Sequence, residues 1–354
     1  MNYVLHCRLL LPIRNATSAA LPAMLRYARR EKQFASAESL LCELFGVARQ
    51  QDIPVAPYAA LGDGLPADQG YWLRADPVSL VLQRDSFTLE RAPETLSLAQ
   101  AQQLVEALSA HFKADGMRFF APAPHRWYLR LEQKPLLQTH PLPDVLHHDI
   151  QNFPLTGADA PHWQRQLNEM QMLLHTHPVN AALEEAGALP VNSLWLWGGG
   201  ELSGAKEPAF TTWADDALPC GLAWANGNQF DILSLPSTAQ EWLARAAAGA
   251  EADAYWIFPG ETLQSDHLVV LPAWSPALER DWLEPLLSAV RDGRLAKLTL
   301  HLETPSATRR APALTDTMKA TIAVPAPQIH SYTLTRRSSV KFWRRSHPLE
   351  YYFD

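Results

Sequence analysis

The stretch from Trp163 to Gly200 constrains the fold of this chain more than any other part of the sequence. Apolar residues recur at helical spacing from Trp163 to Leu174, and Pro178 favours an end of that helix shortly afterwards. A second short helix at 181–186 and the apolar run VNSLWLW then lead into three consecutive glycines. Glycines after a strand let the backbone turn tightly and approach a neighbour or a ligand closely. We therefore expect two helices, a core strand and a glycine loop here, with any functional site nearby.

Helical and strand patterns also alternate along the rest of the chain. The expected helices are 21–30, 37–48, 97–113, 163–175, 181–186, 238–248 and 278–291, and the expected strands are 3–11, 71–83, 86–90, 118–122, 126–132, 191–197, 253–259 and 295–303. This alternation predicts an α/β fold with a mostly parallel sheet flanked by helices. Breaks rich in Pro and other turn or linker residues separate these segments and predict an α/β core at 1–60 and 156–308, an inserted α+β domain at 61–155 and a basic, partly ordered tail at 309–354.

Composition and charge limit the class of protein. Hydrophobic residues make up 47% of the chain, but no apolar run reaches the roughly 18 residues of a membrane span. The net charge is −7, and because 305–354 is basic, the remainder is more acidic still, which argues against nucleic-acid binding. The tail, with Phe342–Arg345, is a candidate contact for a protein partner. Three widely spaced cysteines indicate no disulfide framework, so we expect a reduced, cytoplasmic protein. We also expect no cofactor.

Three charged residues lie on or beside strands that otherwise have a buried pattern: Arg74, Asp76 and Arg126. Charges on buried strands are costly unless they are paired. The pattern therefore indicates either a structural ion pair or an anion-binding site, and the sequence leaves both open.

Histidines supply a second set of candidates. His147, His148 and Asp149 could suggest a metal site, but adjacent residues on an extended chain point to opposite sides, and a polar linker is the simpler interpretation. His175 and His177 flank the end of a predicted helix, where a capping role and a general base both stay open. The three glycines match neither the P-loop nor the dinucleotide pattern, so no nucleotide-binding loop is predicted.

Taken together and in order, several segments between Gly70 and Gly200 resemble the bacterial and archaeal cofactor-independent phosphoglycerate mutases of the alkaline-phosphatase superfamily. The segments are GYWLRAD, LSLAQAQQLVEALSAHF, RFFAPAPHRWYLRL, LHHDI and HTHPVNAALEEAGALPVNSLWLWGGG. The last is similar to the family's His-Pro-x-Asn and Trp-x-Trp-Gly-x-Gly signature. The whole chain resembles more closely the Rpf-type bacterial regulatory proteins, which share this segment. The resemblance implies an alkaline-phosphatase-like core, and the matching positions are Arg74, Arg126, His177, Asn180 and Asn192.

Departures from the family pattern decide the predicted activity. The metal-binding Asp-Gly-x-x-Asp of the mutases has no counterpart in YVLHCRLLLPIR, and their Asp-x-x-x-His is represented only by His301 and Glu303 at a different spacing. The family's Arg-Cys-Asn triplet becomes Arg74-Ala75-Asp76. A dinuclear metal centre needs several carboxylate and histidine ligands. We therefore predict neither catalytic nor metal-binding residues.

The sequence thus predicts a non-catalytic regulatory or ligand-binding protein descended from a phosphoglycerate-mutase-like enzyme. Its partner would be a small phosphate- or carboxylate-bearing metabolite, bound between core and insert, or a protein bound through the tail. The candidate ligand-binding residues are Arg74, Asp76, Arg126, His177, Asn180 and Asn192. The alternative is a divergent metal-dependent phosphatase or phosphoglycerate mutase, with metal ligands from Asp76, His147, His148, Asp149, His175 and His177.

Overall fold

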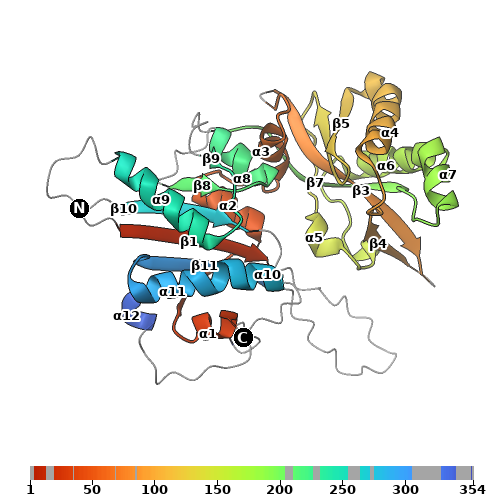
Figure 1. Cartoon of the computed structure of the whole chain (residues 1–354). Coiled ribbons are helices and arrows are strands. Elements are labelled where there is room, and N and C mark those ends of the chain that lie inside the picture. The colour runs from red at the N-terminus through yellow and green to blue at the C-terminus, as the bar shows by residue number, and fades with distance from the viewer. Residues whose placement is uncertain are drawn as a thin grey trace, which may run out of the picture. The chain divides into compact units, whose positions relative to one another are not determined.

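The computed structural model of this chain describes residues 4–12, 20–34, 36–67, 69–83, 86–203, 210–225, 232–253, 264–271, 275–304, 328–339 and 352. These residues form two compact units (Figure 1). The described residues of the first unit lie within Met1–Gly46, Lys206–Leu314 and Val324–Asp354, and those of the second lie within Val47–Ala205. No helix in the described part of the chain has the length and hydropathy of a membrane span.

A seven-stranded sheet organises the first unit, in the order β2-β12-β11-β1-β10-β8-β9. Its strands are β1 (Val4–Pro12), β2 (Arg29–Phe34), β8 (Thr211–Trp213), β9 (Ile232–Leu233), β10 (Gln264–Val270), β11 (Lys297–Thr304) and β12 (Gln328–Thr335). The pairs from β11 through β1, β10 and β8 to β9 are parallel. The pairs β11-β12 and β12-β2 are antiparallel. The sheet is therefore mixed, with a parallel centre and an antiparallel edge.

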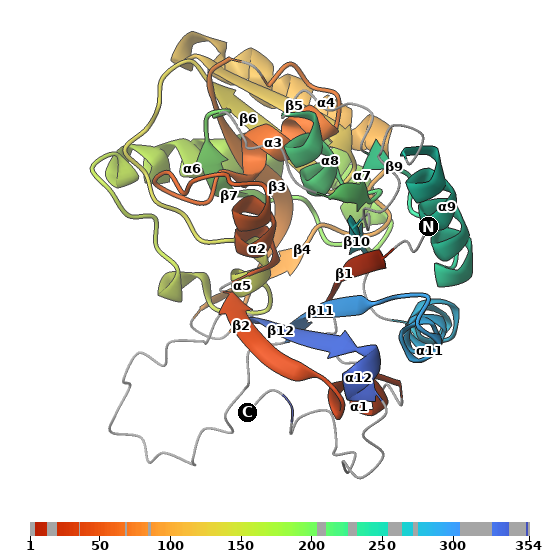
Figure 2. The same cartoon turned by 90° about the vertical axis from the view of Figure 1, so that its left-hand side faces the viewer.

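Helices cover both faces of this sheet (Figure 2). They are α1 (Ala20–Leu25), α2 (Ala37–Leu44), α8 (Ala217–Trp224), α9 (Ala239–Asp253), α10 (Pro276–Leu278), the π-helical turn η4 (Glu279–Leu283), α11 (Glu284–Asp292) and α12 (Arg336–Ser339). Apolar residues of α1, α9, η4 and α11 pack on one face against alternate residues of β11, including Leu298 and Leu300. Helices α2 and α8 contact each other and the strands β12 and β8 from outside that cluster.

The second unit contains a wholly antiparallel five-stranded sheet built around one long strand. Its strands are β3 (Tyr71–Leu82), β4 (Phe87–Arg91), β5 (Met117–Ala123), β6 (Arg126–Leu131) and β7 (Ser193–Gly200). The first half of β3 pairs with β6 and its second half with β4, while β7 pairs with β3 as well. The strand β3 therefore holds the other elements of this unit in register.

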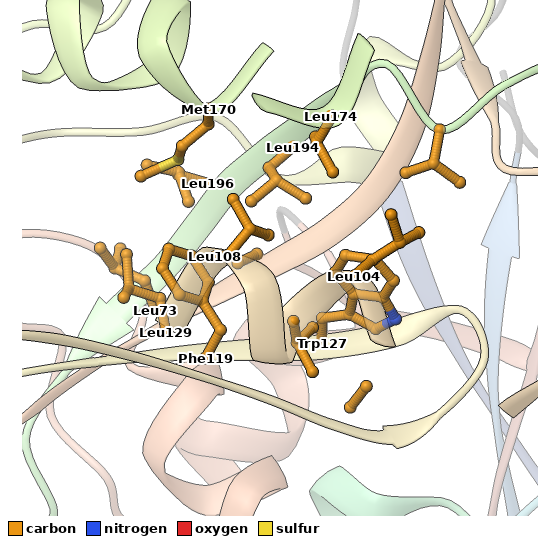
Figure 3. Close-up of a cluster of buried hydrophobic side chains, with 14 of the residues drawn as sticks. Leu73, Leu104, Leu108, Phe119, Trp127, Leu129, Met170, Leu174, Leu194 and Leu196 are labelled. Atoms are coloured by element: carbon orange, nitrogen blue, oxygen red, sulfur yellow. The ribbon is translucent and has the colours of Figure 1, made fainter. Parts of the chain in front are cut away.

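The helical segments of this unit are α3 (Val55–Gly62), α4 (Leu98–His111), η1 (Phe112–Asp115), α5 (Leu142–Val145), η2 (Ile150–Asn152), α6 (Ala160–His175) and α7 (Pro178–Glu185). The apolar sides of α4, α6 and α7 form one core with alternate strand residues, among them Leu73, Leu129 and Leu196 (Figure 3). The predicted N-cap of α4 is present: Ser97 and Gln100 form a reciprocal capping box. Helix α3 contacts β3 and β7.

Three differences from the sequence analysis concern the sheets. A mostly parallel sheet is not confirmed, because six of the ten strand pairs in the described residues are antiparallel. Short connections such as the one between β5 and β6 allow only antiparallel pairing. The predicted glycine loop is instead the end of strand β7, which pairs with β3. The range 309–354, predicted as a partly ordered tail, contains β12, paired on both sides.

The units also divide differently from the predicted domains. The chain passes between the compact units after Gly46 and after Ala205, whereas the predicted insert covers 61–155. The helices α6 and α7 and the strand β7, which the sequence analysis placed in the core domain, pack with β3 in the second unit. The predicted strand at 253–259 falls beyond the described residues from 254 onward, and Phe342–Arg345 lies outside them.

Candidate functional site

The structure brings together three of the six candidate residues, Arg74, Asp76 and Arg126, on β3 and β6. Arg74 and Asp76 are two residues apart on one strand, so their side chains share a face of the sheet. The Nε and Nη2 of Arg74 donate to Oδ1 of Asp76 at 3.1 and 2.6 Å. The two side chains are only 13% and 3% exposed, so this is a buried ion pair.

Two further donors complete the surroundings of the Asp76 carboxylate. The backbone N–H of Trp127 donates to Oδ1 at 3.3 Å, and the indole Nε1–H of Trp197 donates to Oδ2 at 2.8 Å. Asp76 therefore ties together β3, β6 and β7. A buried charge is tolerated when it is paired and its remaining lone pairs accept hydrogen bonds, and both conditions hold here.

A second ion pair joins Arg126 to Asp63, the residue that follows α3. The Nε and Nη2 of Arg126 donate to Oδ2 and Oδ1 of Asp63 at 2.6 and 2.5 Å, which is bidentate geometry. The hydroxyl of Tyr128 donates to Oδ2 of Asp63 at 2.6 Å. The Arg126 side chain is 31% exposed and that of Asp63 is 9% exposed, so this pair lies closer to solvent than the first.

Aromatic rings join the two ion pairs into one group, which we call the arginine cluster (Asp63, Arg74, Asp76, Arg126, Tyr128 and Trp197). The Arg74 guanidinium carbon lies 5.2 Å from the centre of the Tyr128 ring and 5.4 Å from that of Trp197. Burial raises the pKa of Tyr128, so its hydroxyl stays protonated and donates. For Arg74, burial is the largest single influence and lowers the pKa, but the charge of Asp76, the neighbouring Tyr128 and the hydrogen bonds to Asp76 together outweigh it, and the net shift is upward.

The formal charge of the arginine cluster is balanced, since two guanidinium groups face two carboxylates. Such a cluster can hold two arginines rigidly, because each is fixed by hydrogen bonds or by aromatic faces. It offers an incoming anion little net positive charge unless a carboxylate moves aside.

The other three candidates lie in the same unit and have structural partners. The Nδ2 of Asn180 donates to the carbonyl oxygens of Leu174 and Val191 at 2.7 and 2.8 Å, and its Oδ1 accepts from the Val191 N–H at 2.8 Å. The Asn192 amide accepts from the Leu80 N–H at 2.7 Å and donates to the Leu80 carbonyl at 3.0 Å. Asn192 thus extends the pairing of β7 along β3, and Asn180 joins α6, α7 and the approach to β7.

His177 acts as the N-cap of α7. Its Nδ1 accepts from the backbone N–H of Val179 at 3.2 Å, and burial lowers its pKa, which keeps the ring neutral and able to accept. Of the capping and general-base interpretations that the sequence left open, this geometry matches the first.

The three glycines at the end of β7 allow close packing inside the unit. Gly198 has a φ of +64°, and a Cβ there would lie 2.9 Å from Cβ of Val55 in α3. A Cβ on Gly199 would overlap the Tyr71 hydroxyl, and one on Gly200 would overlap Pro54. Side chains at these positions would therefore separate β7 from its neighbours.

Four of the six residues proposed as metal ligands in the alternative interpretation have other contacts: Asp76, His147, Asp149 and His177. His147 Nδ1 lies 2.7 Å from Glu90 Oε2, and Asp149 accepts from the Gln151 N–H at 3.0 Å as the N-cap of η2. Among the described residues, no group of three or more His, Cys, Asp or Glu side chains is placed to hold a metal ion.

Sequence reasoning missed Asp63 and Tyr128 as members of the arginine cluster. Asp63 precedes Gly64, and an Asp-Gly pair in this context is typical of a turn, although an acidic metal-binding loop was also conceivable. Its partners Arg126 and Tyr128 are more than sixty residues away in the chain. Only the alternation along β6, which places Arg126 and Tyr128 on one face, hinted at a shared neighbour.

Comparison with known proteins yields partial matches. No protein-family model matches the chain. A 2,3-bisphosphoglycerate-independent phosphoglycerate mutase from Methanosarcina mazei is 24% identical over 153 residues, which are 42% of this chain and 38% of that protein. One from Methanosarcina barkeri is 26% identical over 118 residues, 33% of this chain and 28% of that protein. The chain is similar to these mutases over part of its length. It spans well under half the length of either relative.

A solved structure also resembles the chain. The cofactor-independent phosphoglycerate mutase from Thermoplasma acidophilum aligns with 97% of this chain and 93% of its own, at 14% identity and a TM-score of 0.43. The sequence matches to the Methanosarcina proteins support the resemblance to cofactor-independent phosphoglycerate mutases drawn from residues 70–200.

Proposed function

We propose that this chain is a regulatory, ligand-binding protein descended from a phosphoglycerate-mutase-like enzyme, and that it does not catalyse phosphoryl transfer. Its ligand is a small anion with a phosphate or carboxylate group. We assign it, by resemblance alone, to the Rpf-type regulatory proteins, and we interpret the seven-stranded sheet as the remnant of an alkaline-phosphatase-like core. A protein partner for the basic tail stays a prediction.

One observation carries this proposal: both arginines that match the mutase pattern form ion pairs inside the second unit. Arg74 is bound by Asp76, which replaces the Asn of the family's triplet, and Arg126 is bound by Asp63. A guanidinium that stabilises a transferring phosphoryl group must meet it with its charge uncompensated. In this chain the carboxylates already compensate both charges.

The Arg126–Asp63 pair is the place where an anion can still enter. Arg126 is the more exposed of the two arginines, and a bidentate carboxylate partner occupies the geometry that a phosphate or carboxylate ligand would use. We infer that a ligand competes with Asp63 for Arg126. Binding is then weak, and it is coupled to the position of Asp63, the residue that follows α3.

The enzymatic question is tested with the purified full chain, by assaying phosphoglycerate mutase and phosphatase activity with and without added Mn²⁺ and measuring metal content. We expect no turnover above the protein-free control in either condition. Metal-dependent turnover that is lost on replacing His147, His148 or His175 would overturn the proposal and establish the divergent phosphatase or mutase instead.

The ligand-binding part is tested by titrating inorganic phosphate into the wild type, Asp63→Asn and Arg126→Gln. Asparagine keeps an acceptor for Tyr128 but removes the competing charge. We expect Asp63→Asn to bind phosphate at least about tenfold more tightly than the wild type, because a charged hydrogen-bonding partner is freed. Equal affinities in the wild type and Asp63→Asn, or undiminished binding by Arg126→Gln, would contradict competition at this site.

A further inference from the structure

A separate pocket of about 480 Å³ lies on the second unit where the C-terminal part of α4 meets β5 and β6. Its volume lies within the usual range of small-molecule binding pockets. Its charged lining is contributed by three basic and two acidic side chains: Lys113, Arg118, Arg130, Glu106 and Glu132. None of these residues belongs to the arginine cluster.

Two of the basic residues face each other across a strand pair. Arg118 of β5 and Arg130 of β6 are directly opposite in the register of the hairpin. Residues directly opposite on antiparallel strands point to the same face with Cβ atoms about 5 Å apart, and like charges in this position repel each other. Neither arginine forms an ion pair with a carboxylate of the described residues. The hairpin therefore carries two neighbouring positive charges, neither of which is in an ion pair among the described residues.

Both guanidinium groups are nevertheless held in place. The Nε of Arg130 donates to the carbonyl oxygen of Gln69 at 3.1 Å. The guanidinium carbon of Arg118 lies 5.0 Å from the centre of the Phe120 ring, which itself packs on Trp72 with ring centres 5.4 Å apart. The first contact uses one Nε–H and the second uses one face of a guanidinium group. Both restrict the arginine side chains before a ligand binds, so that binding costs less side-chain entropy.

The balance of charges identifies the ligand class. A carboxylate compensates one positive charge, whereas a phosphomonoester carries about −1.5 to −2 at neutral pH and compensates two. Glu106 and Glu132 line the same pocket without ion-pair partners among the described residues, so they suit a positively charged group on the same ligand. We propose that this pocket binds a small phosphomonoester that also bears an amine, with its phosphate between Arg118 and Arg130 and its amine toward Glu106 and Glu132.

The test uses the full chain and three probes: O-phosphoserine, inorganic phosphate and serine, each titrated by calorimetry. We expect O-phosphoserine to bind most tightly, phosphate more weakly and serine not at all. Arg118→Gln and Arg130→Gln should each weaken O-phosphoserine binding at least about tenfold. Lysine at either position, which keeps the charge but loses the bidentate geometry, should give an intermediate loss. Replacing both glutamates by glutamine should weaken O-phosphoserine but leave inorganic phosphate unchanged.

Arg165→Gln is the matched control, because Arg165 is exposed on α6 and does not line the pocket. The melting temperature is a second readout, which distinguishes ligand binding in this pocket from a structural effect of the substitution. Without ligand, the Arg118→Gln variant should have a higher melting temperature than the wild type, because repulsion is relieved. O-phosphoserine should raise the melting temperature of the wild type but not that of the variant. The proposal is overturned if O-phosphoserine does not bind, if serine binds equally well, or if both arginine variants bind like Arg165→Gln. Loss of binding in Arg118→Gln places the ligand here and not at Arg126, so this test is independent of the proposed function above.

Discussion

The guanidinium of Arg74 and the carboxylate of Asp76 lie 2.6 Å apart on one face of β3, and both side chains are buried. In the Arg-Cys-Asn triplet that this segment resembles, the position of Asp76 is an asparagine, which could not neutralise the arginine. Asp76 thus makes Arg74 part of an internal ion pair. The same carboxylate also accepts from β6 and β7, so it has become part of the framework of the sheet.

Replacing Asp76 by Asn should therefore destabilise the protein although it restores the mutase-like residue. Asparagine can still accept from Trp197, but Arg74 would be left buried without its counter-charge. Removing one partner of a buried pair typically costs about 3 kcal/mol or more. Urea unfolding followed by tryptophan fluorescence measures this loss, with the exposed Asp115→Asn as a control. A loss no larger than that of the control would show that the pair contributes little.

Asn180 should be more important for stability than for ligand binding. Its side chain satisfies two backbone carbonyls and one N–H, all in a buried position. Asn180→Ala leaves those groups without partners, at about 1–3 kcal/mol each, so we expect a loss of about 3 kcal/mol or more. Asn180→Asp should be at least as harmful, because a carboxylate cannot donate to the two carbonyls. The exposed Asn168→Ala serves as control, and an affinity change without a stability change would assign Asn180 to a ligand site after all.

The strands of the second unit and its helices α4, α6 and α7 could be predicted from sequence, because near neighbours decide them, whereas the helix α3 was not predicted. Ser97 and Gln100 cap α4 within one turn, and alternating apolar residues with a short connection specify the β5-β6 hairpin. In contrast, β2 and β12 were not predicted. The β2 segment RREKQF is charged, and QIHSYTLT follows a segment rich in Pro and Ala. These strands pair with each other although about three hundred residues separate them in the chain, and a local sequence pattern cannot predict such a pairing.

The candidate site, like the fold, could be predicted only where residues close in sequence determine it. The spacing of Arg74 and Asp76 on one strand already indicated a structural ion pair as one of two interpretations, since i and i+2 share a face. Asp63 could not be predicted as a site residue, because its sequence context is typical of a turn and its partner lies far away in the chain. Asn180 and Asn192 were candidates through family resemblance, and their hydrogen bonds to backbone depend on the packing of α6, α7 and β3, which the sequence does not display.

Gly199 should not tolerate even one added methyl group. A Cβ there would overlap the Tyr71 hydroxyl and lie 2.8 Å from Cδ2 of Leu73, both in the core of the second unit. Overpacking of this kind costs about 1–3 kcal/mol, so Gly199→Ala should lower the urea midpoint. Adding Tyr71→Phe to Gly199→Ala should recover part of the loss by removing the overlapping oxygen. Gly187→Ala is the comparison for backbone strain, which Gly199 lacks, since Gly187 has a φ of +75° but nothing lies within 4 Å of an added Cβ.

His267 should make the first unit sensitive to mild acid. It is 4% exposed on β10, its Nδ1 accepts from the Trp213 indole at 3.2 Å, and burial lowers its pKa to about 4 against the partly offsetting charge of Asp266. The unfolded chain binds the proton near pH 6.5, so this contribution to stability is complete above that pH, falls as the pH drops toward 4, and is constant below it. Because the difference is between two and three pKa units, we expect a loss of about 3 kcal/mol. Urea unfolding at several pH values should show this slope in the wild type and a shallower one in His267→Gln, which keeps an acceptor for Trp213 but cannot be protonated. Identical slopes would mean that another group controls the acid sensitivity.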